Sequence, residues 1–565
     1  MYTADMNQTL ARTHRRVAKR TLRSGTTPLW DKARSRRVAG GAPAARFASA
    51  ACVLSLAVFL SSLPAGCADT PSALPTNPAS LPYGLRPAAP VCDYKGTFVC
   101  DDLDGDGLDE EVKYDEGIGG ASFLSVARVR SSQFYSLYTR HLLRKGGVCG
   151  AVEVTGDRTP EIVWWWQASR GTVRVFVSQV AVEDARAEMS PLHSLNIGTA
   201  GSLLPDGQWG AGVSMLGSLD LDSDGLPDAL LLQKCAGILL KPREVFLWDL
   251  DDGVVWRLPT GATPTGGSAV VDIDGDRRPE LFLGLEAPGN GAASGIWNDG
   301  HSYVIAVDSD GRLMWSNELA GYSSDVALAV ADLNGDGETE VVTAIHYHSQ
   351  LDRVGPELAV WRATDGALLD TMRTGCPTNA LIAKECREGM RLFAGSSDGK
   401  LRRIRWEPGT IAVENSLDCG DGVEGIVSFE PRPIIDSWQL AIGTGRGTVA
   451  VVDERLRPLA VLRLEEALDG DNRLRPTSVE TSDGPAGGVI VRSNARIHRY
   501  VLEKRPFELW KTVLVSVLAV VFASVAVPTS RRRTLAALRR WLLPRKTRDE
   551  WIEELLCALA TAGHG

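Results

Sequence analysis

The stretch DLNGDGETEVV, residues 332–342, decides the fold of this chain. It begins like an EF-hand calcium loop, with an acid, an Asn and an acid at alternate positions. The EF-hand motif needs a bidentate Glu at position 12, where this chain has Thr343. The last acid is instead Glu340 at position 9, and a valine pair follows it. The stretch therefore predicts a short calcium turn that runs directly into a β-strand.

The nine-residue pattern occurs five times along the chain. The copies are DLDGDGLDE (102–110), EVTGDRTPE (153–161), DLDSDGLPD (220–228), DIDGDRRPE (272–280) and DLNGDGETE (332–340). Every copy has an acid at position 5 and at position 9, and apolar residues follow in at least four of them. The loop and the strand after it therefore form a repeated unit.

The strand recurs even where the loop pattern is lost. Its first residues are separated by 48 to 67 residues and are, in order, Glu110, Glu161, Asp228, Glu280, Glu340, Arg391, Gln439 and Gly488. A period near 50 built from short strands and Gly/Asp turns is typical of β-propellers. We therefore expect an all-β propeller of four-stranded blades over residues 91–505, with eight blades favoured and seven as the alternative. The eighth unit, residues 476–503, lacks a fourth strand, so we expect the N-terminal end to supply one.

These loops resemble those of the FG-GAP/VCBS repeat family, the calcium-loop propellers also found in integrin α chains. The resemblance implies structural Ca²⁺, bound by side chains at positions 1, 3, 5 and 9 and by a carbonyl at position 7. The ligands implied are Asp102, Asp104, Asp106 and Glu110; Asp220, Asp222, Asp224 and Asp228; Asp272, Asp274, Asp276 and Glu280; and Asp332, Asn334, Asp336 and Glu340. The 153–161 copy departs from the pattern at positions 1 and 3, so Asp157 and Glu161 are expected to form a weak site.

The alternative interpretation of the loops is a set of Asx turns that hold the blades without metal. Converging carboxylates repel one another strongly without a cation, which favours calcium. Arg158 and Arg277 replace Gly at position 6 of two copies and should strain those turns without removing a ligand.

The N-terminal region, residues 1–68, reads as a signal or anchor segment of bacterial type. Residues 1–47 carry 11 Lys and Arg against 2 acids, and an uncharged apolar run and small residues follow, which is the order of a secretory signal. Ala65 and Gly66 before Cys67 resemble a lipobox, which makes Cys67 a candidate for lipidation, although Pro64 stands where Leu is usual. Residues 69–90 are rich in Pro and are expected to form a linker.

The C-terminal region predicts a membrane anchor. Residues 511–530 are almost uncharged and have about the length of a membrane-spanning helix; a buried core helix is the alternative. Three arginines follow, which predicts that the basic tail, residues 531–565, is cytoplasmic. The propeller would then lie outside the cytoplasm, in the periplasm or at the cell surface.

The charge distribution argues against a nucleic-acid partner. The chain has a net charge of −9, while residues 1–47 carry +9 and residues 530–565 carry +4, which leaves −22 for the part between them. Phosphate binding needs a positive surface, and this part of the chain is acidic.

Other residues are weaker candidates for function. His346 and His348 share one face of a strand as a candidate metal pair without a third ligand. In a strand Trp164 and Trp166 share one side and Trp165 takes the other, so we expect at least part of this run to pack between blades, with stacking against sugars on an open face as the alternative. The tryptophans of the outer hairpins, Trp256, Trp315 and Trp361, are likewise expected to pack.

The cysteines allow disulfides, since an exported domain permits them. Cys92 and Cys100, and Cys376 and Cys386, are close enough in sequence to close small loops, and the sequence does not fix the connectivity.

No catalytic motif is present: the chain has no H-E-x-x-H, no G-x-S-x-G and no P-loop. We therefore expect no enzyme but a membrane-anchored recognition or adhesion module for a protein or a glycan. The alternatives are a receptor that signals through the tail or a partner, and a propeller enzyme acting on polysaccharide. Fold-level analogy is a weak basis for choosing between them.

Overall fold

The computed structural model describes residues 73–504 apart from short gaps, of which 348–356 and 465–473 are the longest. The predicted signal or anchor segment 1–68 with Cys67, the transmembrane segment 511–530 and the tail 531–565 lie outside the described residues, and they stay predictions. No helix in the described part is long and apolar enough to cross a membrane.

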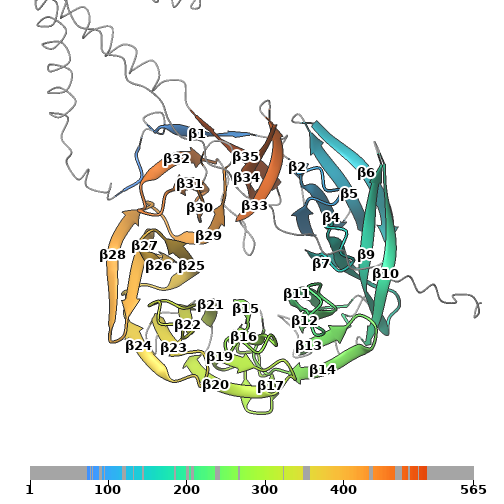
Figure 1. Cartoon of the computed structure of the whole chain (residues 1–565), viewed down its shortest axis with the longest axis horizontal. Coiled ribbons are helices and arrows are strands. Elements are labelled where there is room, and N and C mark those ends of the chain that lie inside the picture. The colour runs from blue at the N-terminus through green and yellow to red at the C-terminus, as the bar shows by residue number, and fades with distance from the viewer. Residues whose placement is uncertain are drawn as a thin grey trace, which may run out of the picture. The chain divides into compact units, whose positions relative to one another are not determined.

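The described chain forms eight antiparallel sheets that follow one another around a ring (Figure 1). In blades 1 to 7 the first strand lies next to the centre of the ring and the fourth lies at its outer rim. Both the all-β propeller fold and the favoured count of eight blades are confirmed.

The strands of the first four blades are β3 (Gly96–Asp101), β4 (Glu110–Glu116), β5 (Ser122–Arg130) and β6 (Gln133–Leu142); β7 (Gly146–Val152), β8 (Glu161–Gln167), β9 (Thr172–Glu183) and β10 (Arg186–Gly198); β11 (Gly212–Leu219), β12 (Ala229–Cys235), β13 (Arg243–Asp249) and β14 (Gly253–Pro259); and β15 (Ser268–Val271), β16 (Glu280–Leu285), β19 (Ser302–Val307) and β20 (Leu313–Ala320). A small hairpin, β17 (Ala293–Ser294) and β18 (Trp297–Asn298), is inserted in blade 4.

The strands of the last four blades are β21 (Ser324–Ala331), β22 (Glu340–Tyr347), β23 (Leu358–Arg362) and β24 (Leu368–Met372); β25 (Thr378–Cys386), β26 (Gly389–Ser396), β27 (Lys400–Glu407) and β28 (Thr410–Asp418); β29 (Val423–Phe429), β30 (Gln439–Thr444), β31 (Thr448–Val452) and β32 (Pro458–Arg463); and β33 (Leu474–Thr481), β34 (Gly484–Ser493) and β35 (Arg496–Lys504) with β1 (Tyr83–Pro87) and β2 (Cys92–Asp93).

The N-terminal end closes the ring, as the missing fourth strand of the last unit predicted. β1 pairs antiparallel with β35, from Tyr83 opposite Lys504 to Pro87 opposite Tyr500. Tyr83 and Leu85 pack against the hydrophobic cluster between blades 7 and 8. The expected linker 69–90 therefore supplies part of the propeller, because its apolar residues complete a sheet that the C-terminal end leaves one strand short.

The hydrophobic core is divided into clusters that lie between neighbouring blades, because each sheet has apolar side chains on both of its faces. The three consecutive tryptophans of β8 demonstrate the alternation. Trp164 is buried between blades 1 and 2, with Trp166 beside it, whereas Trp165 is buried between blades 2 and 3. The predicted packing role of these residues is confirmed.

Tryptophans of the outer strands join one blade to the next. Trp256 Nε1 donates to the carbonyl of Ser309 at 3.0 Å, and Trp315 Nε1 donates to the carbonyl of Ala363 at 2.7 Å. Both carbonyls belong to the turn between the third and fourth strands of the next blade. Each turn contains a glycine with positive φ, and that of blade 5, Gly366, lies against the Trp315 ring.

We expect Gly366→Ala to lower the free energy of unfolding by about 2–4 kcal/mol. The new Cβ would lie 2.6 Å from the Trp315 ring, and the residue has φ +69°, so steric overlap adds to backbone strain. Gly253 has the equivalent turn position in blade 3, with φ +93° and open space around its Cβ position, so Gly253→Ala should show the strain alone, about 1 kcal/mol. Urea unfolding of the two variants measures the difference, and equal losses would rule out the Trp contact as a source of stability.

Cys376 and Cys386 do not form the small disulfide loop that their spacing allows, because both are free thiols. Cys386 ends β25, and Cys376 precedes the start of that strand. An extended chain of this length separates the two by about 30 Å, well beyond disulfide reach. The side chain of Cys92 lies outside the described residues, so its pairing with Cys100 stays a prediction.

Candidate functional site

The five acidic loops each join the inner strand of a blade to its second strand. Four of the final acids, Glu110, Glu161, Glu280 and Glu340, are the first residues of β4, β8, β16 and β22, and Asp228 directly precedes β12. This confirms that position 9 begins a strand. All five loops follow the ends of inner strands and therefore lie on the same face of the ring.

Each loop is held by hydrogen bonds from its own backbone to its acids. In blade 4, Asp272 accepts from the N–H of Gly275 at 2.7 Å and from that of Arg277 at 2.9 Å. Glu280 accepts from the N–H of Ile273 at 3.0 Å. The other loops repeat this arrangement, with an acid at position 9 that accepts from the N–H of position 2. These bonds fix the carboxylates of a loop around one point.

The loop backbone has positive φ at positions 4 and 6. Gly fills most of these positions, and Arg158 and Arg277 adopt φ of 74° and 69° at position 6. Ser223 at position 4 of the 220–228 loop has φ 62°, so three non-glycine residues lie in this left-handed region. The two arginines confirm the expected strain, while the neighbouring acids keep their places in the turn.

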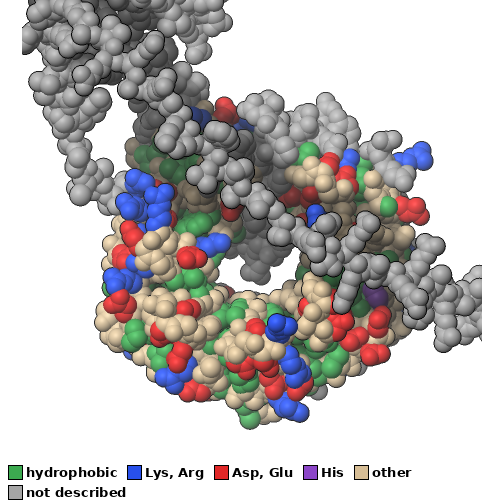
Figure 2. Space-filling view, viewed as in Figure 1, with side chains coloured by type: hydrophobic (Ala, Val, Ile, Leu, Met, Phe, Trp, Pro, Cys, Tyr) green, Lys and Arg blue, Asp and Glu red, His purple; other side chains and the backbone are tan. Residues whose placement is uncertain are grey.

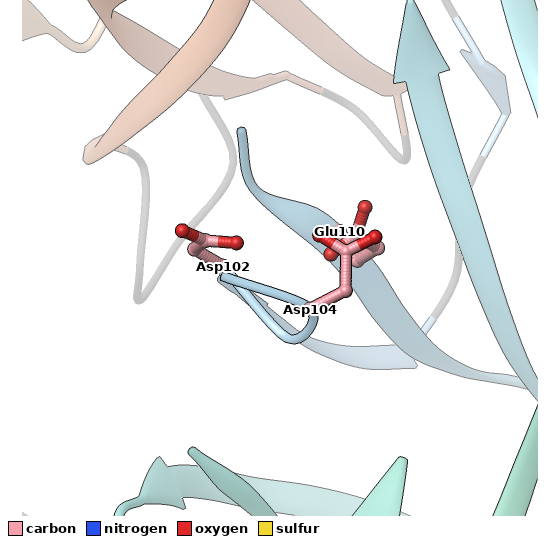
Figure 3. Close-up of side chains that lie close together, drawn as sticks. All are labelled: Asp102, Asp104 and Glu110. Atoms are coloured by element: carbon pink, nitrogen blue, oxygen red, sulfur yellow. The ribbon is translucent and has the colours of Figure 1, made fainter. Parts of the chain in front are cut away.

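Four loops bring three acid side chains together, with one oxygen of each within 4.8 Å of the others. The groups are Asp102, Asp104 and Glu110 (Figure 3); Glu153, Asp157 and Glu161; Asp220, Asp222 and Asp228; and Asp272, Asp274 and Asp276. Because oxygens bind Ca²⁺ at about 2.4 Å, ligands on opposite sides of one ion are about 4.8 Å apart. The spacing therefore fits a single cation, also in the 153–161 loop that was expected to be weak.

The remaining expected ligands lie in the same turns: Asp106, Asp224, Glu280, and the fifth set Asp332, Asn334, Asp336 and Glu340. In the fifth loop the amide of Asn334 donates to Asp336 Oδ2 at 2.8 Å. An amide at position 3 therefore satisfies one carboxylate oxygen without a cation.

The pKa values of the loop acids shift in different directions. Burial, together with the nearby Asp336, Asp332 and Glu338 carboxylates, raises the pKa of Glu340 to about 7. The N–H of Glu338 and the side chain of Asn334 instead lower the pKa of Asp336. A cation in the loop would favour the ionised form of Glu340, so its binding would release protons near neutral pH.

The opposite face of the ring has a different set of polar side chains. The inner strands begin there, and Asp325, Asn379 and Glu424 are the second residues of β21, β25 and β29. These strands border the centre of the ring in Figure 1, and Figure 2 shows an opening there. Three consecutive blades thus contribute a polar residue at the mouth of the central channel.

Hydrogen bonds connect these blades. His346, opposite Asp325 in the β21–β22 ladder, has Nδ1 2.5 Å from Asn379 Oδ1, and Asn379 Nδ2 donates to Glu424 Oε2 at 3.1 Å. Because the Asn379 amide nitrogen faces Glu424, its oxygen faces His346 and accepts a hydrogen bond from the Nδ1–H group. The side chains of His346, Asn379 and Glu424, from blades 5, 6 and 7, therefore hold one another in position.

Two charged residues of blade 7 extend this set. A Cβ on Gly445 would lie 3.4 Å from Asp421 Oδ2 and 3.5 Å from Glu424 Oε1, so both carboxylates approach one glycine. Arg446 Nε is 3.8 Å from Asp421 Oδ1, and its side chain is exposed. We call His346, Asn379, Asp421, Glu424 and Arg446 the channel-mouth network. It offers fixed hydrogen-bond donors and acceptors to hydroxyl-rich or cationic groups.

The sequence analysis found the acidic loops but not this network. It singled out His346 as half of a metal pair with His348, which lies outside the described residues. The partner found here is the amide of Asn379. One feature of the sequence could have indicated the network: a polar residue is second in each of three inner strands. It becomes informative only when the blades are aligned in space.

Comparisons with known proteins find solved structures of similar fold but do not assign the chain to a family. No family model matches the sequence, and no curated protein matches it. Among solved structures, the chain is similar to Sqt1 of Chaetomium thermophilum (13% identity, 74% of this chain and 97% of that chain, TM-score 0.46) and of Saccharomyces cerevisiae (12%, 77% and 100%, TM-score 0.45). BamB from Moraxella catarrhalis is also similar (13%, 74% and 99%, TM-score 0.39). These scores are too low to carry an argument, so the propeller assignment rests on the order and pairing of the strands.

Proposed function

We propose that this chain is an exported, membrane-anchored recognition or adhesion module that binds a protein or glycan partner at its channel mouth. The observation that supports this most is the network in which His346, Asn379 and Glu424 link three blades around the central opening. Propellers are common interaction scaffolds, and partners often bind at such a face.

The chemistry of the network suits a ligand with hydroxyl or cationic groups. Asp421 and Glu424 carry two carboxylates near one glycine, where little side-chain volume covers them. Backbone and side-chain groups that are held in place before binding lose less entropy when a partner arrives. The acidic loops lie on the other face, so a partner at the mouth would not compete with a structural cation.

A matched pair of crosslinking sites tests this proposal. A photo-crosslinking residue replaces Asn379 on the inner strand or Asn415 on the outer strand β28 of the same blade, in full-length protein in its host membrane. We expect a defined partner at position 379 and none at 415. In parallel, purified protein is applied to an array of envelope and host glycans, with Glu424→Gln as the disabled variant.

The outcomes separate the candidate functions. Selective crosslinking or glycan binding that Glu424→Gln weakens at least tenfold supports recognition. Turnover of a bound polysaccharide would favour the enzyme, and a cytoplasmic protein bound to the tail would favour the receptor. Equal crosslinking at both positions, with no glycan bound, would overturn recognition at the mouth.

We further propose that calcium stabilises the acidic loops, as the family resemblance implies. Carboxylate groups with cation spacing support this for the 220–228 and 272–280 loops in particular. EDTA is expected to lower the melting temperature of the full-length protein in detergent, and calcium to restore it. Each occupied site would add about 2.7 kcal/mol when free calcium is 100 times its Kd.

The control for calcium is Asp274→Asn, which removes one ligand charge from the 272–280 loop and should reduce the calcium response. Magnesium serves as the ion control, since it prefers a smaller and more regular shell. An unchanged melting temperature between EDTA and millimolar calcium would overturn calcium stabilisation and leave the Asx-turn interpretation.

A further inference from the structure

We propose that in blade 1 the guanidinium of Arg128 takes the place of a metal ion, so that the 102–110 loop is held without calcium. The inference rests on the proposed calcium stabilisation only for its contrast with the 220–228 and 272–280 loops. It makes blade 1 a permanently assembled part of a ring in which the loops of blades 3 and 4 respond to metal.

Arg128 occupies the ligand set itself. It lies on β5 directly opposite Glu110 in the β4–β5 ladder. Its Nε donates to Glu110 Oε1 at 2.7 Å, and its Nη2 bonds Asp104 Oδ2. One guanidinium thus bridges positions 3 and 9 of the loop, two of the positions from which the family binds its ion. The planar fork of Arg suits such a pair of carboxylates.

The contacts are buried and use the oxygens that an ion would need. The side chains of Arg128 and Glu110 are 7% and 0% exposed. Glu110 Oε2 accepts from the N–H of Leu103 at 3.1 Å, so both oxygens of this acid already have a donor. Asp102 accepts backbone N–H groups with both oxygens, as Asp272 does in blade 4, so the arginine is what distinguishes the loop of blade 1. A divalent ion would have to displace a positive group from a buried pair of carboxylates, which like-charge repulsion opposes.

The same ladder position in the other blades provides the comparison. It is Gln179 in blade 2, Leu250 in blade 3 and Asp308 in blade 4, none of which brings a positive charge. Blade 5 has Arg362, which bonds Asp365 of its own turn at 3.0 Å and lies 3.9 Å from the exposed Glu338 at position 7, not from the third or ninth acid. Among these five residues, Arg128 is the cation that bonds the third and ninth acids of its loop.

The position of blade 1 in the ring gives this arrangement a consequence. Glu111 follows Glu110 on β4, so its side chain is on the other face of the sheet, and there it pairs with Arg499 of blade 8. Two neighbouring acids of β4 are therefore both neutralised by arginines. The seam where the last blade meets the first would stay closed when calcium is removed.

Hydrogen–deuterium exchange of the full-length protein, with EDTA or with millimolar calcium, tests the inference loop by loop. In the wild type we expect at least fivefold slower exchange on adding calcium at 220–228 and 272–280, and no change at 102–110. Arg128→Gln should make 102–110 calcium-responsive. Arg362→Gln is the matched control and should leave the response of 332–340 as it is in the wild type.

Every outcome decides the inference. A calcium response at 102–110 in the wild type would overturn it while leaving calcium stabilisation intact. A loop that stays unresponsive in Arg128→Gln would also overturn it. If the 102–110 loop of Arg128→Gln is the only loop that responds, the proposal that Arg128 replaces the ion is supported, and the calcium proposal for the other loops fails. Should Arg128→Gln melt too early for exchange, recovery of its melting temperature by calcium but not by magnesium takes the place of the exchange result, and no recovery overturns the inference.

Discussion

Replacing Tyr83–Pro87 by five Gly and Ser residues is expected to open the ring and to lower the free energy of unfolding by on the order of 5 kcal/mol. These five residues form β1, the outer strand that pairs with β35. The change removes the packing of Tyr83 and Leu85, about 1–2 kcal/mol each. Without this packing the flexible Gly/Ser segment is expected to leave the sheet, and the backbone hydrogen bonds to β35, about 1 kcal/mol each, are then lost as well. Small domains have only about 5–15 kcal/mol in total, so the loss would be large.

Thermal and urea unfolding of the full-length variant measure this loss. A synthetic peptide of residues 73–90, added in trans, should restore part of the melting temperature of the variant, because the edge of β35 is then free to accept it. A scrambled peptide of the same composition is the control. A variant that melts with the wild type would show that β1 is not needed for closure.

Arg499→Ala is expected to cost about 3–5 kcal/mol. Arg499 and Glu111 are each 2% exposed, and they pair across the seam between blades 8 and 1. Removing the arginine leaves the buried Glu111 carboxylate with only the more distant Lys113, whose Nζ is 3.8 Å from Glu111 Oε1, and this loss costs more than the net value of the pair. The effect should change little with salt, since a buried pair is screened weakly.

The matched control is an exposed ion pair within blade 8. Arg86 Nε lies 2.8 Å from Glu503 Oε2, but these side chains are 43% and 50% exposed. Arg86→Ala should therefore cost less than about 1 kcal/mol. The double variant Arg499→Met with Glu111→Gln should recover part of the loss, since it removes the buried carboxylate together with its arginine. Equal effects of Arg499→Ala and Arg86→Ala would contradict the importance of the buried pair.

Much of the ring could be predicted because the sequence patterns that specify its turns and strands are local. Each loop brings its own acids together through bonds to its own backbone, as Asp272 does with Gly275. Each strand alternates its side chains between two neighbouring blades, as Trp164 and Trp165 do. A pattern that repeats about every 50 residues therefore predicted the fold, the blade count and the strand that closes the ring.

Two predictions based on local sequence were wrong, because neither took account of where the strands lie in the fold. Cys376 and Cys386 looked close in sequence, but the strand between them holds them apart. The stretch of prolines before residue 90 looked like a linker, but its apolar residues complete the last blade.

A ring of blades with acidic turns on one face can be predicted from local patterns, because turn geometry and strand alternation act over a few residues. Which charged side chains meet depends instead on how the strands pair and how the ring closes. Arg128 bonds the acids of its loop because the β4–β5 register places it opposite Glu110. The channel-mouth network, and the Glu111–Arg499 pair, form because the ring brings together strands that are remote in the chain. Such contacts depend on register and closure, which no local pattern encodes.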